Sequence, residues 1–568
     1  MPQHVVVIGA VALGPKAACR FKRLEPDSRV TMIERGKRIS YGGCGIPYYV
    51  SGDISDASAL QSTAFHMLRD EAFFKATKGV DVRTETEALA IDPKAKTVTV
   101  RHLPTGREET LSYDKLVMAT GSTPNRLPVP GADLDGVYCV AGLEDAEAIR
   151  ARVASGKVGS AVVVGGGFIG LEMATAFADM WGIETTVLEY MDHILPSVAG
   201  PVTARMACRH MEEKGVHFRF GEKLMRLEGD GAVERLVTDK GTIDADLVIL
   251  SVGVTPNSKL AKDAGLHVGP RGGIIVDETL RTSDPDIFAG GDCVQIKNLV
   301  TGGPSYLPLG SMANRQGRVI GTNLAGGHAR FEGASGAWCV KLFEQSAAGV
   351  GLPIQAALRE GFDAVNVHVS MLDRAHFYPE KGLMSLDLVV ENTTGRILGM
   401  QGVSVMGDSL VGKVDAVSAL LPHKPVCADL GNLEMAYSPP FASAMDILNV
   451  LGNVADNIVS GQNRGMGVDE FEILWAERAD NGIFVLDCRE RDNVAELIAR
   501  HPKDWHNIPQ GELAGRLAEV PKDRPVVVIC NTGARSYEAL VTLVHNGYAG
   551  TRSVEGGMAA VHAAGLDI

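Results

Sequence analysis

The sequence predicts an α/β protein of several domains, because a glycine-rich strand–turn–helix pattern occurs twice and a third apolar strand precedes a cysteine loop near the C-terminus. With 568 residues, the chain has room for three or four domains. Its composition, 45% hydrophobic and 22% charged, is typical of a globular protein. A net charge of −14, without a run of lysines and arginines, argues against nucleic acid or an anionic membrane surface as a general partner.

No stretch of the sequence reaches the roughly 18 consecutive apolar residues that a membrane span needs. Residues 1–10 lead directly into a strand, without the layout of a signal peptide. We therefore expect a cytoplasmic protein. The nine cysteines include no Cys-x-x-Cys pair, so neither structural disulfides nor a metal site is expected.

The first βαβ module covers residues 4–34. A run of valines ends at Gly9, a helical pattern follows, and a second strand ends at Glu34. Gly9 permits a tight turn and Gly14 permits close helix packing, so that the helix N-terminus faces a pyrophosphate, while Glu34 can accept from a ribose hydroxyl. Val11 replaces the middle glycine of the Gly-x-Gly-x-x-Gly motif, so a simple glycine-rich turn stays an alternative.

The second copy of the motif is complete. Gly165, Gly167 and Gly170 follow a strand and open a helix, and the next strand ends at Glu189. We therefore expect two bound dinucleotides, each on a Rossmann-like domain. A carboxylate at position 189 accepts a bare 2′-hydroxyl and repels a 2′-phosphate, which favours NADH over NADPH.

Three further segments, at residues 113–125, 245–257 and 281–293, resemble the strand–turn segments of the two-dinucleotide flavoprotein disulfide reductases. The resemblance implies FAD on the first module and NADH on the second. It also implies contacts to FAD from Thr120, Gly121 and Asp292, the last at the ribityl chain.

The same resemblance implies a domain order. We expect an FAD-binding domain at 1–120 plus 255–325, an NADH-binding domain at 121–254, and an α+β dimerisation domain at 326–455.

A single cysteine, Cys44, lies in the stretch ISYGGCGIPYYVSGDI at residues 39–54. Its glycine neighbours let sulfur and backbone approach a flat cofactor closely. The family architecture lays it beside the flavin ring, although a buried structural cysteine is an alternative. Because no second cysteine is near, the other sulfur must come from the substrate or a bound small thiol, and the thiolate is the reactive species.

This stretch places the chain in the single-cysteine branch, which contains coenzyme A disulfide reductases, NADH-dependent persulfide reductases, NADH oxidases and peroxidases. It is most similar to the coenzyme A disulfide reductase group. That group often has asparagine before its cysteine, where this chain has Gly43, so one polar contact to coenzyme A is absent.

Two tyrosines match those that reach the coenzyme A sulfur from the partner subunit in that group, Tyr378 and Tyr437. A phenol can hydrogen-bond a leaving thiolate and supply a proton. A rigid surface turn is the alternative for these positions. Arg20, Lys22 and Arg23 on the first helix offer cations for the phosphates of coenzyme A, or form a solvated helix face.

Residues 464–568 form a further expected domain. A strand leads into Cys530, and the loop from Cys530 to Arg535 opens an amphipathic helix, so backbone amides gather around the sulfur. This resembles a rhodanese-type sulfurtransferase domain of α/β fold. Four residues separate Cys530 from Arg535, one fewer than in cysteine phosphatases, which favours sulfur over phosphate.

The usual Gly-His-Ile-Pro-Gly-Ala segment of such domains is reduced here, with His501 and Pro502 as its remnant. An inactive structural module is therefore an alternative for the tail.

Together these features predict a homodimeric flavoprotein that oxidises NADH and reduces persulfide, polysulfide or coenzyme A disulfide substrates at Cys44. The tail would handle sulfane sulfur at Cys530, aided by Arg535. An NADH oxidase or peroxidase that uses a cysteine sulfenic acid is the first alternative. A redox-sensing binding protein without turnover is the second.

Overall fold

The computed structural model describes residues 1–568. The chain divides into two compact units, which are described separately. One unit contains Met1–Tyr190 and Gly221–Ala334, and the other contains Met191–Phe220 and Ser335–Ile568. No helix is long and apolar enough to cross a membrane.

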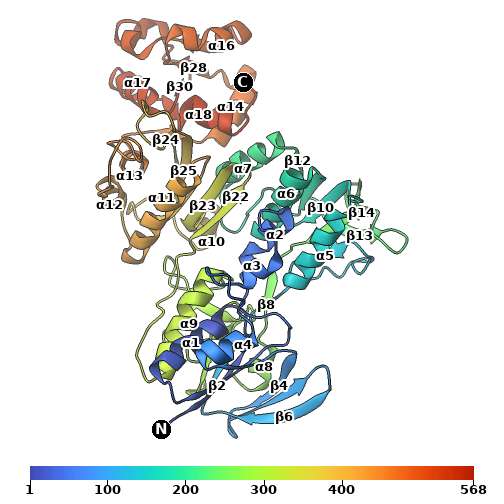
Figure 1. Ribbon diagram of the computed structural model, residues 1–568. Coiled ribbons are helices and arrows are strands. Elements are labelled where there is room, and N and C mark those ends of the chain that lie inside the picture. The colour runs from blue at the N-terminus through green and yellow to red at the C-terminus, as the bar shows by residue number, and fades with distance from the viewer. The chain divides into compact units, whose positions relative to one another are not determined.

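A five-stranded parallel sheet forms the first module of unit 1. Its strand order is β19 (Ile287–Ala289), β7 (Lys115–Met118), β1 (His4–Ile8), β2 (Arg29–Ile33) and β3 (Asp81–Arg83). Apolar residues fill nearly every position of the central strands because both faces of the sheet are buried. The helices α1 (Leu13–Leu24) and α9 (Gly310–Leu324) pack against each other (Figure 1).

A second parallel sheet in unit 1 has the strands β11 (Glu184–Glu189), β10 (Ser160–Val164), β16 (Leu247–Leu250) and β9 (Val137–Tyr138) in that order. The helix α6 (Phe168–Trp181) connects β10 to β11, which gives the same βαβ unit as in the first module. Unit 1 also contains two three-stranded antiparallel sheets. One consists of β4 (Thr86–Asp92), β5 (Thr97–His102) and β6 (Arg107–Ser112), and the other of β13 (Leu224–Glu228), β14 (Arg235–Thr238) and β15 (Thr242–Asp244).

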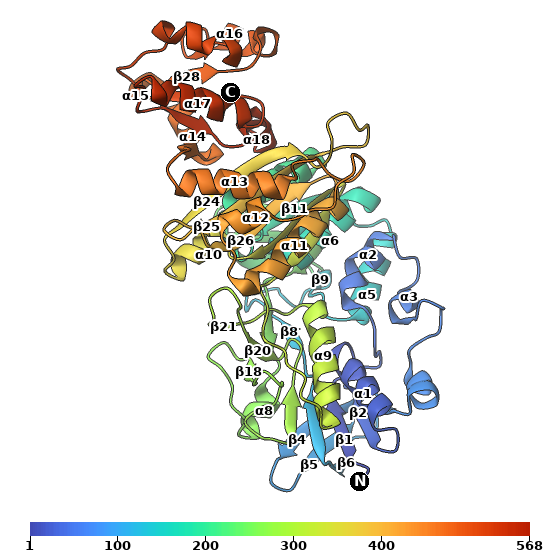
Figure 2. The ribbon, with the colours of Figure 1, turned by 90° about the vertical axis from the view of Figure 1, so that its left-hand side faces the viewer.

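Unit 2 contains a five-stranded antiparallel sheet. Its strand order is β22 (Trp338–Leu342), β23 (Gln345–Gly351), β26 (Ile397–Ser404), β25 (Leu383–Glu391) and β24 (Ala364–Leu372). The helices α11 (Gly407–Leu420) and α13 (Ile447–Val459) pack on the sheet, with α12 (Cys427–Gly431) against α13 (Figure 2).

Buried polar side chains mark one face of β24 and β25. His368 Nδ1 bonds Asp387 at 2.9 Å, and Thr203 of α7 (Pro201–Glu213) also contacts Asp387. Glu555 of the C-terminal segment accepts from the backbone N–H of His368 at 2.6 Å. These buried contacts join the antiparallel sheet to the C-terminal part of the same unit.

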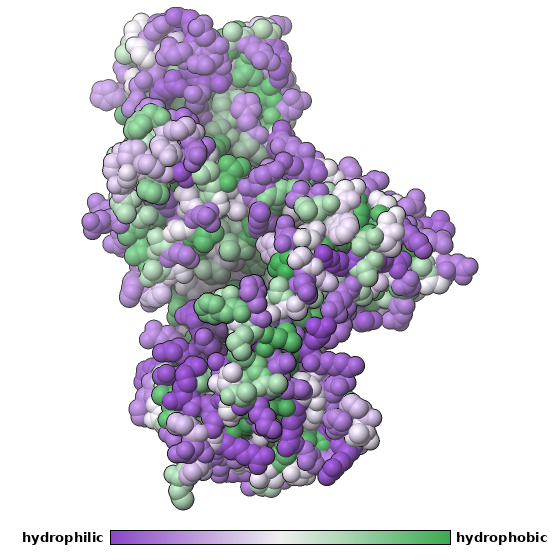
Figure 3. Space-filling view, in the orientation of Figure 1, coloured by the Kyte–Doolittle hydropathy of each residue, from purple (hydrophilic) through white to green (hydrophobic).

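The C-terminal part is a parallel sheet in the order β27 (Gly465–Met466), β31 (Arg552–Val554), β30 (Val526–Ile529), β28 (Phe484–Asp487) and β29 (Trp505–Asn507). Its helices include α14 (Val468–Ala476), α16 (Ala495–Arg500), α17 (Ala534–His545) and α18 (Gly557–Ala563). Hydrophilic residues cover most of its surface that is visible in Figure 3. The α/β class predicted from the sequence is confirmed, with parallel sheets in both nucleotide modules and in the tail.

Candidate active site

The two glycine-rich turns of unit 1 have the same backbone conformation. Gly9 has φ +108° and Gly165 has φ +109°, in the region that favours glycine. A Cβ at Gly9 would lie 2.1 Å from the carbonyl oxygen of Ala119, and one at Gly165 would lie 2.4 Å from that of Ser251. Glycine is therefore required at both strand ends for the chain to turn into the helix.

The third glycine of each motif allows the helix to pack against the turn. A Cβ at Gly14 would lie 1.9 Å from the carbonyl oxygen of Gly9, and one at Gly170 would lie 2.0 Å from that of Gly165. The middle position differs, because a Cβ at Gly167 would meet no atom within 4 Å. The complete motif thus leaves open space for a pyrophosphate, whereas Val11 fills the corresponding position with a half-buried side chain.

A carboxylate lies at the end of the second strand in both modules. Glu34 accepts from the backbone N–H of Ala10 at 2.9 Å and from that of Gly36 at 2.9 Å. Glu189, which is 8% exposed, accepts from the backbone N–H of Gly166 at 2.7 Å. Each carboxylate is therefore fixed beside its glycine turn, which is the place where an acid meets the ribose of a bound dinucleotide.

The segments predicted to contact FAD are hydrogen-bonded to each other within unit 1. Thr120 Oγ1 donates to the carbonyl of Asn257 at 2.6 Å, and Asn257 Nδ2 donates to the carbonyl of Thr120 at 2.9 Å. Ser122 Oγ donates to Asp292 at 3.3 Å, next to Gly121 with its φ of +65°. Burial raises the pKa of Asp292. These residues fit the FAD-binding role that the resemblance implies.

Cys44 lies in a single turn, Gly43–Gly45, that leads into α2 (Ile46–Ser51). As a whole residue, Cys44 is exposed. A Cβ at Gly310, the first residue of α9, would lie 3.4 Å from its sulfur. Desolvation by the surrounding atoms, followed by the charges of Glu172 and Asp292, raises the pKa of the Cys44 thiol. The fold thus brings the single cysteine and the predicted FAD residue Asp292 together.

Glu172 is a site residue that the sequence reasoning missed. It lies in α6, and Tyr48 Oη of α2 donates to its carboxylate at 3.3 Å. Burial raises the pKa of Glu172 to about 7. An acid in the largely apolar first half of α6, two residues after Gly170, was the available signal. Its carboxyl group can hold and release a proton near Cys44 at neutral pH.

The three predicted coenzyme A cations have different surroundings. Arg20 Nε donates to Thr322 Oγ1 at 3.1 Å, which links α1 to α9. Lys22 Nζ donates to the carbonyl of Ser28 at 2.6 Å, and Arg23 is exposed. The ammonium group of Lys22 is thus occupied by the turn after α1. Binding of coenzyme A by these residues stays a prediction.

The two predicted tyrosines lie on neighbouring loops of unit 2. Arg374 donates to the carbonyl of Pro440 at 2.7 Å and pairs with Asp373 at 2.7 Å, which ties the loop of Tyr378 to that of Tyr437. Tyr437 is 51% exposed, and Tyr378 is half-buried. Both phenols are therefore carried on one side of unit 2 by loops that hold each other.

Cys530 directly follows β30 and begins the loop into α17. Its sulfur accepts from the backbone N–H of Gly533 at 3.2 Å and lies 3.6 Å from Ser536 Oγ. Gly533 has φ +108°, which turns the loop so that its amide faces the sulfur. Arg535 lies in the first turn of α17 and is half-buried. The arrangement is that of a small anion cradle at a helix N-terminus.

The neighbouring strand supports this loop. Arg489 donates to both carboxylate oxygens of Asp487, and Trp505 Nε1 donates to the same carboxylate at 3.0 Å. The N–H of Met558 donates to the carbonyl of Cys530 at 2.8 Å. Asp487 and Arg489 therefore fix the end of β28 beside the cysteine loop.

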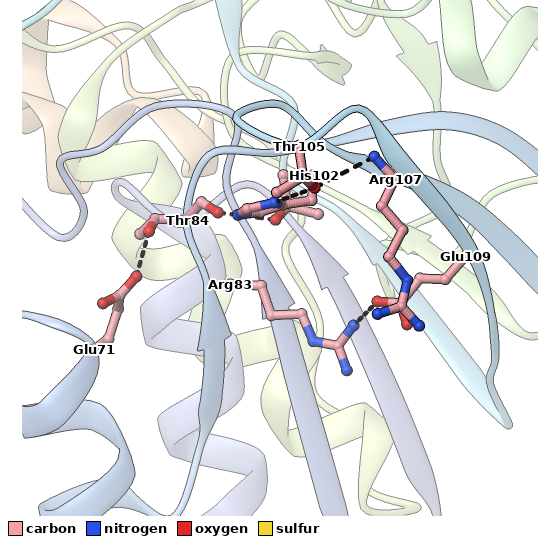
Figure 4. Close-up of a pocket in the computed structure, with 8 residues that line it drawn as sticks. Glu71, Arg83, Thr84, His102, Thr105, Arg107 and Glu109 are labelled. Atoms are coloured by element: carbon pink, nitrogen blue, oxygen red, sulfur yellow. Dashed lines mark hydrogen bonds and ion pairs between the residues drawn. The ribbon is translucent and has the colours of Figure 1, made fainter.

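One polar pocket of about 550 Å³ lies outside these arrangements, over the sheet of β4, β5 and β6. Figure 4 shows that several residues that line it are hydrogen-bonded or ion-paired with one another. Arg83 pairs with Glu109, Thr84 bonds Glu71, and His102 Nδ1 lies 2.8 Å from a threonine hydroxyl. None of the predicted site residues lines this pocket.

The chain resembles known proteins over nearly its whole length. Residues 3–317 match the model of the pyridine nucleotide-disulphide oxidoreductases, and residues 470–564 match the model of the rhodanese-like domain. The structure of an NAD-dependent persulfide reductase from A. fulgidus is 39% identical, with a TM-score of 0.92, and the match covers 98% of this chain and 99% of that one.

Two curated relatives each match about four fifths of the chain. An NAD(P)H coenzyme A polysulfide/persulfide reductase of Pyrococcus horikoshii is 35% identical over 455 residues, which are 80% of this chain and 98% of the relative. An NADH oxidase of Methanocaldococcus jannaschii is 32% identical over 447 residues, 79% of this chain and 97% of the relative.

Proposed function

Since the chain belongs to the pyridine nucleotide-disulphide oxidoreductases and also carries a rhodanese-like domain, we propose that it is an NADH-dependent flavoprotein that reduces persulfides, polysulfides or coenzyme A disulfides. The overall reaction with a persulfide converts NADH, a proton and RSSH into NAD⁺, RSH and hydrogen sulfide. Similarity to a persulfide reductase over the full chain supports this choice.

The setting of Cys44 is the observation that carries the proposal. This exposed residue lies in a turn among the residues predicted to bind FAD, without a second cysteine in that turn. The thiolate of Cys44 attacks a substrate sulfur, so that the S–S bond of the substrate breaks, one fragment leaves as a thiolate or hydrosulfide, and the other is bonded to Cys44 through a new S–S bond. Bound FAD would take hydride from NADH and supply the two electrons that cleave this new bond, which releases the second fragment and restores the Cys44 thiolate.

The leaving fragment needs a proton, and this chain offers two sources. Glu172 is mostly protonated below about pH 7, because burial raises its pKa to about 7. Tyr378 and Tyr437 are the second source, provided that they reach Cys44 of a partner subunit in a homodimer. The exposed aromatic residues beside them, Phe377 at 66% and Phe441 at 73%, support an interface on that side.

The rhodanese-like domain has a separate task in this proposal. Cys530 takes sulfane sulfur from a donor and holds it as a persulfide, stabilised by the amide of Gly533 and the charge of Arg535. It thereby supplies sulfur that Cys44 reduces. Coenzyme A is a suitable substrate or carrier, because its long arm ends in a thiol and its phosphates suit Arg20 and Arg23.

The domain assignment that accompanies this function is FAD at 1–120 plus 255–325, NADH at 121–254, dimerisation at 326–455 and sulfur transfer at 464–568. NADH is the proposed coenzyme because the carboxylate of Glu189 is buried beside the glycine turn. A cytoplasmic location stays a prediction.

The test is anaerobic turnover of the flavin-loaded protein with NADH and either coenzyme A persulfide or glutathione persulfide. We expect NADH oxidation to match sulfide release one for one. An NADH oxidase would instead consume oxygen with NADH, without any sulfur compound, faster than it reduces persulfides. Negligible turnover with every sulfur donor and with oxygen would favour a redox-sensing protein.

A further inference from the structure

A second cysteine, Cys488, lies beside Cys530 on the neighbouring strand. The parallel strands β28 and β30 pair Leu486 with Val528 and Asp487 with Ile529. The backbone N–H of Cys488 donates to the carbonyl of Ile529 at 2.8 Å, so the pairing continues past the last registered pair. Cys488 is therefore the next partner of Cys530.

The strand register and the alternation of side chains place both cysteines on the same face of the sheet. Side chains alternate along a strand, and Cys488 continues the buried row of Phe484 and Leu486. Cys530 follows Val528 in the same way on β30, and Val528 belongs to that same apolar cluster. Paired residues on neighbouring strands are about 4.8 Å apart, within the range of about 4.4 to 6.8 Å between Cα atoms that a disulfide needs.

Cys488 has no part in the function proposed above. It is fully buried, and burial, together with the charges of Asp487 and Cys530, raises the pKa of its thiol to about 12. The thiol is therefore protonated while Cys530 carries sulfur. Cys530 begins the loop that turns at Gly533, whereas Cys488 is held by a strand whose end Asp487 and Trp505 fix. A small movement of the Cys530 loop can bring the sulfur of Cys530 within bonding distance of the sulfur of Cys488.

We propose that Cys488 is the resolving thiol of Cys530 and forms a reversible disulfide with it when Cys530 is oxidised by a peroxide. The thiolate of Cys530 attacks hydrogen peroxide, so that an S–O bond forms, the O–O bond breaks and hydroxide leaves. This oxidises the sulfur by two electrons to the sulfenic acid. The sulfur of Cys488 then attacks, the S–O bond breaks, and the proton of Cys488 leaves with the hydroxyl group as water.

The disulfide stops sulfur transfer without destroying the loop. It occupies the sulfur of Cys530, so no persulfide can form there, and it prevents the further oxidation to sulfinic acid that is not reversed by thiols. A dithiol reductant restores both cysteines and is itself oxidised to a disulfide. The site is thus a modification site that switches the tail off under oxidising conditions.

The experiment uses the full-length, flavin-loaded protein and one molar equivalent of hydrogen peroxide. Free thiols are alkylated under denaturing conditions, the protein is digested, and the cysteine peptides are measured by mass spectrometry. We expect a linked Cys488–Cys530 peptide in the wild type. Sulfurtransferase activity from thiosulfate should fall at least tenfold and return with dithiothreitol.

The variant Cys488→Ala should keep its initial sulfurtransferase activity but lose it irreversibly with peroxide, as Cys530 passes to sulfinic acid. The matched control Cys427→Ala, which removes a buried thiol from another part of unit 2, should behave like the wild type.

Absence of the linked peptide, with Cys530 reaching sulfinic acid equally fast in the wild type and in Cys488→Ala, would overturn the inference. The linked peptide is measured without any turnover. It therefore tests the disulfide even if the sulfur-transfer function proposed for Cys530 is wrong, or if the Cys488→Ala variant does not fold.

Discussion

Cys44 and Cys530 both lie where a turn leads into a helix, but their surroundings are assembled in different ways. The neighbours of Cys44 come from distant segments, with Glu172 on α6, Asp292 after β19 and Gly310 at the start of α9. Those of Cys530 come from the C-terminal part alone, with Gly533, Ser536 and Met558 as direct contacts. In the proposed function, Cys44 receives electrons from cofactors that several segments hold together. Cys530 carries sulfur, which requires only the contacts of one loop.

The electrostatics of the two sites differ in the same sense. Carboxyl groups face Cys44 and help to raise the pKa of its thiol, so they favour keeping a proton at that site. A backbone N–H faces Cys530 and favours an anion. In the proposed function, Cys44 therefore depends on bound FAD and on a partner subunit for its reactivity, while the contacts of the Cys530 loop all come from one chain.

The largest expected effect concerns the dependence of Cys44 on a partner subunit. A Cys44→Ser chain and a Tyr378→Phe/Tyr437→Phe chain should each lose persulfide reduction. Exchange of subunits at equal amounts should restore about a quarter of the wild-type rate, because half of the dimers are hybrids with one intact site. Steady-state rates before and after exchange measure this.

Sulfur transfer at Cys530 should not change on this exchange, which serves as the internal control. If hybrids form, as shown by differently tagged chains, and no rate returns, then the tyrosines act within one chain or outside the chemistry.

The next effect concerns the charge in the cysteine loop of the tail. Arg535→Ala should lower sulfurtransferase activity by about 10² to 10³, because a positioned donor to a developing anion has that effect. It should leave NADH-driven reduction of glutathione persulfide unchanged. Arg535→Lys, which keeps the charge, should lose less. Equal losses in both assays would show that the two thiols do not work separately.

A smaller effect should come from a substitution in the second nucleotide module. In the proposed function this module binds the NADH whose electrons reach Cys44 but not Cys530. Glu189→Gln keeps an acceptor for Gly166 but removes the charge that repels a 2′-phosphate. The ratio of kcat/KM for NADH over NADPH should fall by about 10- to 100-fold.

Glu184→Gln, at the exposed start of the same strand, is the matched control and should keep the wild-type ratio. A wild-type protein that uses both coenzymes equally would refute the role of Glu189.

The smallest effect concerns the proton near Cys44. The pKa of Glu172 is raised from 4.5 to about 7, so the carboxyl group is protonated below pH 7 and ionised above it. If it supplies the proton, kcat/KM for persulfide should fall as the pH rises through about 7. Glu172→Gln should remove that fall and lower the rate several-fold at pH 6, with little change at pH 8.5.

An unchanged pH profile in Glu172→Gln would assign the titration to another group. The sulfurtransferase reaction should have the same pH profile in Glu172→Gln as in the wild type. That assay therefore separates an effect at the Cys44 site from a general loss of structure.

The glycine motifs were predictable because their requirement is local. At Gly9, Gly14, Gly165 and Gly170, an added Cβ would collide with backbone a few residues away or on the next strand, so the residue type alone reveals the turn. The α/β class and the family followed from these motifs and from the cysteine loops, and both are confirmed.

The pair of Tyr48 and Glu172 was not predictable, because it depends on how α2 packs on α6 over 124 residues of sequence. The position of Cys488 beside Cys530 was not predictable either, because it depends on the register of β28 and β30. Contacts between distant segments were thus the part that sequence could not supply.

The division of work between the two thiols is the central claim, and one comparison tests it most directly. Glutathione persulfide is reduced with NADH by Cys44→Ser and by Cys530→Ser, both folded and loaded with flavin. We predict no turnover for Cys44→Ser, although NADH still reduces its flavin, and a kcat/KM within about twofold of the wild type for Cys530→Ser. Loss of persulfide reduction in Cys530→Ser as complete as in Cys44→Ser would contradict the account, because the tail would then be an obligatory step.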